Sequence, residues 1–250
     1  MLTSWKLFPT CSSGIEEEIS NLNINKASGP FSIPSEILKL LKDLLSKPLE
    51  ILFNCSFMHE IVPDKFKIAR VLPVFKKGLE TDFNNYRLIS LLSFFNRILE
   101  RLVYKCLIKY INKHNILFNK QFGFRYSHST DHAILCIVDK IQSAIESGQF
   151  SCGIYLDLSK AFDTVNNSSL LEKLEHYGIH GIAKDWFSSY LKNRHQFFSI
   201  ENTCSDYLEF FCDVPQGSVL GLLLFLIYIN DFWLCSTKLD FHLFADDSNL

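Results

Sequence analysis

Apolar residues in the first quarter of the chain recur at helical spacing. The stretch SEILKLLKDLLSKP (35–48) follows Pro34, and proline is favoured at the start of a helix. Its apolar stripe consists of Ile37, Leu38, Leu41, Leu44 and Leu45. A second apolar stretch, LEILFNCSFMHE (49–60), precedes Pro63. The pattern predicts one helix over 35–48 and another that ends before Pro63.

After Pro63 the spacing of the apolar residues is no longer helical. In KIARVLPVFKKG (67–78), β-branched and apolar residues flank Pro73 and end at Gly78, which predicts a strand pair or an extended segment with basic ends. Helical spacing returns over 93–115 and over 129–148. Ser129 or Thr130 is the expected N-cap of the second of these helices, and Gly148 is its expected end.

The remaining residues mix short strands with helices. FSCGIYLDLS (150–159) is short, apolar and β-prone, which predicts a central strand covered on both faces. The other expected elements are helices over 168–178 and 182–194, a hairpin with a glycine loop over 195–217, a buried helix over 218–230 and a strand over 238–247. Strands and helices do not alternate regularly, so the expected class is α+β.

Composition agrees with a folded protein. Of the 250 residues, 48% are hydrophobic and 21% are charged, and the 23 phenylalanines predict an aromatic core. The net charge of −2 gives no overall basic field, so nucleic-acid binding depends on local clusters. The longest apolar run, VLGLLLFLIYI (219–229), is too short to span a bilayer, and no membrane partner is expected.

The eight cysteines include no C-x-x-C pair, and no histidine cluster at zinc-ligand spacing accompanies them. The beginning of the chain, MLTSWKLFPTCSSG, lacks the apolar stretch of a signal peptide. We therefore expect buried, reduced thiols in an intracellular protein of the nucleus or cytoplasm that is not secreted.

Three carboxylates follow apolar strands. Asp157 ends one predicted strand, and Asp246 and Asp247 end another. Taken alone, Asp157 also suits a helix cap or a turn. Brought together, the three would repel one another unless divalent cations lay between them, and oxygen-rich sites suit Mg²⁺ and Mn²⁺. Two ions roughly 3.5–4 Å apart can activate a hydroxyl and stabilise a leaving phosphate oxygen. The carboxylates alone also suit a nuclease or a phosphatase.

The segment CDVPQGSVLG (212–221) leads into the predicted buried helix. Pro215 fixes the approach of the chain, Gly217 permits a close backbone approach, and Gln216 offers an amide donor and acceptor. This pattern fits an ordinary loop before a helix, and it also fits a base or sugar contact at the helix N-terminus.

Taken in order, these motifs resemble the reverse transcriptase domain of jockey-type non-LTR retrotransposons, over about residues 20–250. The matching strings are NKASGPFSIPSEILK (25–39), LPVFKKG (72–78), NNYRLISLLSFFNRILER (84–101), QFGFRYSHSTDHA (121–133), YLDLSKAFDTV (155–165), HYGIHGIAKDWFSSYLKNRHQ (176–196), VPQGSVLG (214–221), FLIYINDF (225–232) and FADD (244–247). Any one string is weak, whereas the ordered set is specific.

The resemblance implies a right-hand polymerase of class α+β, with a lead-in over 1–20, a fingers-type helical region with a basic strand segment over 21–150 and a palm over 151–250. It implies an RNA-directed DNA polymerase that uses an RNA template, a DNA primer and dNTPs. The primer 3′-hydroxyl would attack the α-phosphate of the dNTP and release pyrophosphate.

The resemblance also implies roles for individual residues. Asp157, Asp246 and Asp247 would be the catalytic ligands of two Mg²⁺ or Mn²⁺ ions. Phe162 would be the steric gate against a ribose 2′-hydroxyl, although a core phenylalanine fits the same position. Gln216 and Gly217 would line the nucleotide and template side of the site.

Basic residues complete the implied site. Lys76, Lys77 and Arg87 would neutralise the triphosphate, and Arg's fixed fork suits phosphate oxygens. A solvated basic turn is the alternative for the lysine pair. Arg125 in FGFR would contact the template backbone.

The chain departs from the family pattern at Phe31–Ser32, Leu88, Asp213 and Leu222, where Asp-Gly, Pro, Gly and Pro are usual. Family members continue past the Asp-Asp turn with further palm strands and a thumb. We therefore expect an incomplete palm without a thumb, a catalytic hairpin without its return strand, and weak or absent polymerase activity. The alternative function is an inactive remnant of a decayed element that keeps the fold and binds RNA at most.

Overall fold

The computed structural model describes residues 4–23, 29–30, 33–158, 161–200, 203–210, 214–215, 217–245 and 247–249. For residues 210 and 247–249 it describes the backbone alone. Two predicted site residues, Gln216 and Asp246, lie outside the described residues, as do Phe31–Ser32 and Asp213.

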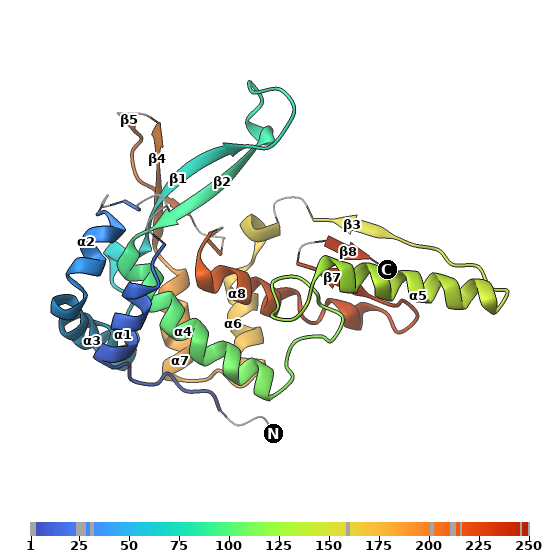
Figure 1. Ribbon diagram of the computed structural model, residues 1–250, viewed down its shortest axis with the longest axis horizontal. Coiled ribbons are helices and arrows are strands. Elements are labelled where there is room, and N and C mark those ends of the chain that lie inside the picture. The colour runs from blue at the N-terminus through green and yellow to red at the C-terminus, as the bar shows by residue number, and fades with distance from the viewer. Residues whose placement is uncertain are drawn as a thin grey trace.

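Three helices form one end of the molecule (Figure 1). They are α1 (Ser12–Ser20), α2 (Ser35–Leu40) and α3 (Lys42–Met58). The predicted boundaries between 35 and 60 are wrong, because the helix breaks at Leu41 while α3 continues through Pro48. The break divides the expected apolar stripe between two helix axes. Leu38 is therefore buried, whereas Leu44 is 74% exposed.

Five strands form the larger sheet. They are β1 (Ile68–Phe75), β2 (Tyr86–Leu92), β4 (Arg194–Ile200), β5 (Thr203–Cys204) and β6 (Leu208–Phe210). The order is β2-β1-β4-β5, with β6 also on β4. Of the two alternatives for 67–78, the extended segment is confirmed, because these residues form the single strand β1. Its antiparallel partner β2 lies beyond the predicted segment and was not expected from the sequence. Pro73 is tolerated in β1 because the parallel pairing with β4 covers only Ile68–Val71.

The predicted helices of the core are confirmed in type and approximate position. They are α4 (Phe94–Lys113), α6 (Asn167–His176), α7 (Ile182–Leu191) and α8 (Val219–Ile229). Helix α8 is apolar all round and lies within one core cluster that also takes in side chains of the other three helices. Short 3₁₀ helices cover Asp64–Lys67, Phe83–Asn85, Ala161–Thr164 and Phe232–Cys235.

A second, three-stranded sheet lies at the opposite end from α1–α3 (Figure 1). It has the order β3-β8-β7 and consists of β3 (Tyr155–Asp157), β7 (His242–Phe244) and β8 (Asp247–Asn249). Helix α5 (Thr130–Glu146) runs beside it, and Ser129 caps α5 as predicted. The expected lack of a return strand is wrong, because residues 247–249 suffice to pair with β7 as β8.

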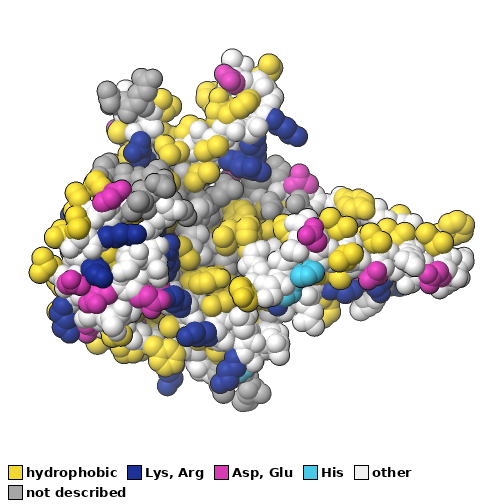
Figure 2. Space-filling view, viewed as in Figure 1, with side chains coloured by type: hydrophobic (Ala, Val, Ile, Leu, Met, Phe, Trp, Pro, Cys, Tyr) yellow, Lys and Arg dark blue, Asp and Glu magenta, His cyan; other side chains and the backbone are white. Residues whose placement is uncertain are grey.

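The expectation that β3 is covered on both faces is also wrong. Strand β3 is the edge of its sheet, and Tyr155 is 70% exposed. Within α5 only Ala133 is buried. Apolar side chains consequently show along the arm that α5 and β3 form (Figure 2). An apolar sequence does not reveal whether a neighbouring layer lies against the strand.

The thiols differ from expectation too. The seven described cysteines are free, as predicted, but none is fully buried and Cys11, Cys152, Cys204 and Cys235 are exposed. All four lie outside α4, α6, α7 and α8: Cys11 precedes α1, Cys152 lies in a loop, Cys204 lies in β5 and Cys235 ends a 3₁₀ helix. No helix within the described residues is long and apolar enough to cross a membrane.

Candidate functional site

The small sheet brings two of the predicted carboxylate positions together. Antiparallel pairing places the Cα of Asp157 opposite that of Asp247, and Asp247 is also opposite Phe244. Directly opposed positions in an antiparallel pair belong to the same face, with Cβ atoms about 4.5–5.5 Å apart. The register of β3 and β8 therefore brings Asp157 next to the Asp-Asp motif, although 90 residues separate Asp157 from Asp247 in the chain.

The turn between β7 and β8 has a left-handed residue. Ala245 has φ +57° and is 3% exposed. Left-handed backbone is disfavoured for a residue with a Cβ, and hairpins with two-residue loops require it. Something outside the hairpin must therefore hold this turn.

Gln121 and Gly123 hold it. Gln121 Oε1 accepts hydrogen bonds from the backbone N–H of Gly123 at 2.9 Å and of Ala245 at 3.0 Å. Backbone bonds between Phe122 N and Leu243 O and between Leu243 N and Lys120 O, at 2.8 and 2.9 Å, join the segment 120–123 to β7. This bracing of the turn was missed from the sequence, where the motif QFGFR suggested a role for Arg125 alone.

Gly123 lies so close to the turn that no side chain fits there. A Cβ built on Gly123 would lie 2.3 Å from Ala245 N. A glycine between two phenylalanines was the available sequence signal, because glycine is used where backbones approach closely.

We expect Gly123→Ala to displace the turn, because the clash is with backbone and not with a mobile side chain. Overpacking of this kind costs about 1–3 kcal/mol. The measurement is the urea midpoint of unfolding. Gly14→Ala is the matched control, since a Cβ there meets nothing closer than 3.8 Å. Equal midpoints for wild type and Gly123→Ala would contradict the close packing.

The Arg125 side chain forms hydrogen bonds within its own loop. Its Nη1 donates to the carbonyls of Phe118 at 2.8 Å and Gln121 at 3.2 Å. Burial lowers the pKa of the Arg125 guanidinium. The side chain thus fastens the loop that braces the turn, and its predicted template contact stays a prediction.

Phe162 packs in the core. Its ring stacks on Phe225 of α8 with centroids 4.4 Å apart, and it forms a T-shaped pair with Phe124 at a centroid distance of 6.4 Å. The side chain is 7% exposed. These contacts match the alternative of a core phenylalanine, and the steric gate stays a prediction.

The glycine loop before α8 fits between β2 and the helix. Gly217 has φ +107°, and a Cβ on it would lie 3.0 Å from Ser90 O. Gly221 packs under the loop, where a Cβ would lie 2.9 Å from Pro215 O. Ser218 Oγ caps the helix by accepting from Gly221 N at 2.9 Å. Both glycines are therefore required by close approach.

The buried side chain of Glu100 in α4 holds the first turn of α8. Glu100, 1% exposed, accepts from Tyr190 Oη and from Val219 N, both at 2.7 Å, and from Asn96 Nδ2 at 2.8 Å. The guanidinium of Arg194 lies over the Tyr190 ring and donates to the Tyr190 carbonyl at 2.9 Å. We call these five residues the Glu100 cluster. The cluster connects α4, α7, β4 and α8 next to residues 217–218. No short sequence motif predicted it.

The predicted triphosphate ligands lie apart from the small sheet. Lys76, Lys77 and Arg87 are exposed on the β1–β2 hairpin, with Arg87 opposite Val74. Among the described residues, no hydrogen bond or ion pair joins any of the three to Asp157. The exposed lysines also fit the alternative of a solvated basic turn.

Asp157 suits a cation site by its surroundings. It is exposed and forms no ion pair with any residue that the structure describes. Within the same residues, no three His, Cys, Asp or Glu side chains gather as metal ligands. The other two predicted ligands are Asp246, which is outside the description, and Asp247, described by its backbone. Acidic positions opposed on the neighbouring strands β3 and β8 fit the oxygen ligands that Mg²⁺ and Mn²⁺ take.

Comparison with known proteins points in one direction. The family described as reverse transcriptase (RNA-dependent DNA polymerase) matches residues 74–250. The probable RNA-directed DNA polymerase from transposon BS of Drosophila melanogaster is 30% identical over 224 residues, covering 87% of this chain. The RNA-directed DNA polymerases from mobile element jockey of Drosophila melanogaster and Drosophila funebris are 29% and 28% identical, over 87% and 89% of the chain. The chain spans about a quarter of each relative, 24% in all three cases.

Proposed function

The chain belongs to the reverse transcriptase family, and we propose on that premise that its small sheet carries the catalytic site of an RNA-directed DNA polymerase. The observation that supports the proposal most strongly is the pairing of Asp157 with Asp247 beside the Ala245 turn. The proposed substrates are an RNA template, a DNA primer and dNTPs.

The proposed reaction is nucleotidyl transfer. The primer 3′-hydroxyl attacks the α-phosphorus, a new P–O bond forms, the bond to the β-phosphate oxygen breaks, and pyrophosphate leaves while the hydroxyl proton passes to solvent. Asp157, Asp246 and Asp247 would hold two Mg²⁺ or Mn²⁺ ions. Such ions, when bound, lower the pKa of the attacking hydroxyl and neutralise charge on the leaving oxygen.

Other residues of the chain would position the substrates. Lys76, Lys77 and Arg87 would meet the triphosphate from the β1–β2 hairpin, where their exposure leaves them free to bind it. Gly217 and Gln216 would face the nucleotide from the glycine loop. Phe162 would exclude a ribose 2′-hydroxyl by contact with its ring. This contact requires the ring to move from Phe225 or the sugar to approach the exposed part of the ring.

The proposed fingers and palm, 21–150 and 151–250, interlock in this structure. Strand β4 from the second range pairs with β1 from the first. In the other direction, segment 120–123 braces β7. The β1–β2 hairpin and the small sheet are thus both tied across the proposed boundary.

The test is addition of one dTMP residue to oligo(dT) annealed to poly(rA), with Mg²⁺ or Mn²⁺. A single addition requires only the site and no processive movement. We expect metal-dependent addition with dTTP, and much less with UTP. No addition above a no-metal control would contradict the proposal and support the inactive remnant.

A further inference from the structure

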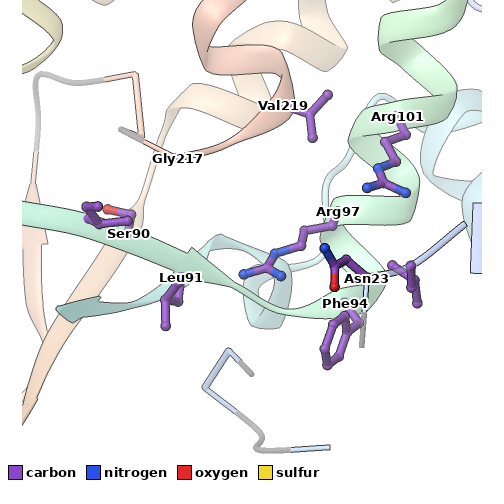
Figure 3. Close-up of a pocket in the computed structure, with 10 residues that line it drawn as sticks. Asn23, Ser90, Leu91, Phe94, Arg97, Arg101, Gly217 and Val219 are labelled. Atoms are coloured by element: carbon purple, nitrogen blue, oxygen red, sulfur yellow. The ribbon is translucent and has the colours of Figure 1, made fainter. Parts of the chain in front are cut away.

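Two cavities of similar size differ in the charge of their walls. One, of about 300 Å³, lies between β2, α4 and the glycine loop, and Figure 3 shows Arg97 and Arg101 extending toward it from α4. The other, of about 330 Å³, is lined by residues 115–119, 176–177, 230–231 and 233–234, and we call it the Trp233 cavity. The described residues that line it include Asp231 but no lysine or arginine. The proposed reaction gives the Trp233 cavity no role.

Three helices end at the Trp233 cavity. Helix α4 ends at Lys113, α6 at His176 and α8 at Ile229, and residues at or just after each end line the space. The C-terminal end of a helix carries about half a negative charge, because its last carbonyl groups have no partner within the helix. The field of the three helix ends therefore favours a cation in the cavity.

A lysine side chain already binds at one of these ends. Lys173 Nζ donates to the carbonyl of Tyr228, in the last turn of α8, at 2.6 Å. The same ammonium group pairs with Asp231 Oδ1. The end of α8 thus attracts positive charge from within the chain, as the direction of the helix dipole requires.

Asn230 holds the cavity in shape. This residue is 5% exposed, and its Oδ1 accepts from Phe118 N at 2.7 Å. Its Nδ2 donates to Ile116 O at 2.8 Å and to Tyr177 Oη at 2.9 Å. These bonds join the segments that follow α4 and α6 to the end of α8. The cavity is therefore formed before a ligand arrives, as is usual for binding sites.

Two side chains of the cavity keep free binding capacity. The second carboxylate oxygen of Asp231, Oδ2, has no partner within the described part of the chain, and the side chain is 41% exposed. The indole of Trp233 stacks on Phe118 with centroids 5.1 Å apart, and Trp233 is 39% exposed. A carboxylate and an aromatic face in one cavity suit a guanidinium, because the planar group stacks while its N–H fork donates to the carboxylate.

Other cations fit this lining less well. A divalent metal ion needs several oxygen ligands, and no three His, Cys, Asp or Glu side chains gather among the described residues. An ammonium group is compact and strongly hydrated, so it has no flat surface to place on the indole. Leu234, 63% exposed at the cavity, offers apolar contact to the neighbours of a bound arginine in a polypeptide.

We propose that the Trp233 cavity binds an arginine side chain of a partner protein, with the guanidinium stacked on Trp233 and hydrogen-bonded to Asp231 Oδ2. The proposal goes beyond the polymerase reaction and does not depend on it, because none of these residues belongs to the proposed catalytic site.

The test follows the indole N–H signals of the chain by ¹H–¹⁵N NMR while N-acetylargininamide is added. The chain has three tryptophans, and Trp233→Phe identifies the signal of Trp233. This signal should shift and saturate, whereas the signals of Trp5 and Trp186, which are buried, should stay in place. N-acetylcitrullinamide, which has nearly the same shape without the charge, should shift the Trp233 signal far less at equal ionic strength.

Two variants should change the affinity in opposite directions. Asp231→Asn should weaken argininamide binding about tenfold, the loss expected for one charge-assisted hydrogen bond. Lys173→Gln should strengthen it, because the cation that competes for Asp231 is removed. Asp206→Asn removes the same charge from an exposed site that does not line the cavity, and it should bind as wild type does.

Several results would overturn the proposal. They are a Trp233 signal that argininamide does not move, equal shifts with citrullinamide, an Asp231→Asn variant with wild-type affinity, and binding of N-acetyllysinamide as tight as that of argininamide. A Lys173→Gln variant that unfolds at the wild-type temperature but binds more weakly would also contradict it. Unchanged thermal unfolding of Asp231→Asn would show that its loss of affinity is not a loss of fold.

Discussion

Asp157→Asn should lower the rate of dTMP addition by about 10³-fold or more, which corresponds to losing about 4 kcal/mol of transition-state stabilisation. Among the three proposed metal ligands, Asp157 is the one whose side chain the structure describes. The register of β3 and β8 places it opposite Asp247. An amide keeps the size of the side chain but removes the charge that two divalent cations require. Single-turnover addition to oligo(dT) on poly(rA) measures the effect.

The control for this substitution is Asp185→Asn. Asp185 is exposed in the first turn of α7 and undergoes the same chemical change without belonging to the site. Its rate should equal that of wild type. Because Asp157 is exposed at a sheet edge, Asp157→Asn should also unfold at the wild-type temperature. Addition by Asp157→Asn within a few fold of wild type would remove Asp157 from the proposed site.

Glu100→Ala should have the largest effect on stability, about 3–5 kcal/mol in the free energy of unfolding. The substitution leaves Arg194, which is 0% exposed, without the carboxylate that offsets its charge. It also removes the acceptor of Val219 N–H at the start of α8. Urea unfolding measures the loss, and Glu172→Ala on the exposed face of α6 should stay within about 0.5 kcal/mol of wild type.

The pH dependence of stability in wild type and in Glu100→Gln tests how burial affects the Glu100 carboxyl group. Burial raises the pKa of Glu100 above its ordinary value of 4.5, so the folded chain retains this proton at pH values where the unfolded chain has lost it. The stabilisation that this proton provides is complete below about pH 4.5 and is lost as pH rises through the folded pKa. Glu100→Gln should therefore flatten the fall in stability over that window. A slope identical to that of wild type would show that Glu100 does not titrate in this way.

Local sequence signals were enough to predict most helices. Ser129 is one of the two predicted N-caps of α5, and helical periodicity predicts the positions of α4, α6 and α7. The change of period around Pro73 predicted the extended segment that forms β1, but not its partner β2. These features depend on residues close together in the chain, so the sequence determines them without knowledge of the fold.

Contacts between distant segments could not be predicted in this way. Gln121 bonds to Ala245 across 124 residues, and Glu100 bonds to Val219 across 119. The exposure of β3 likewise depends on which layers surround the small sheet. The motifs predicted which residues matter at the site, whereas the elements that hold them in place became visible only in three dimensions.

The central claim is that Asp157 and its partners in the small sheet hold catalytic divalent cations, and Mn²⁺ binding tests it most directly. Electron paramagnetic resonance of free Mn²⁺ can be followed while chain is added together with poly(rA)/oligo(dT) and dTTP. Two ions per chain are expected for wild type, with at least one lost in Asp157→Asn and none lost in Asp185→Asn. Equal Mn²⁺ binding by wild type and Asp157→Asn would contradict the account.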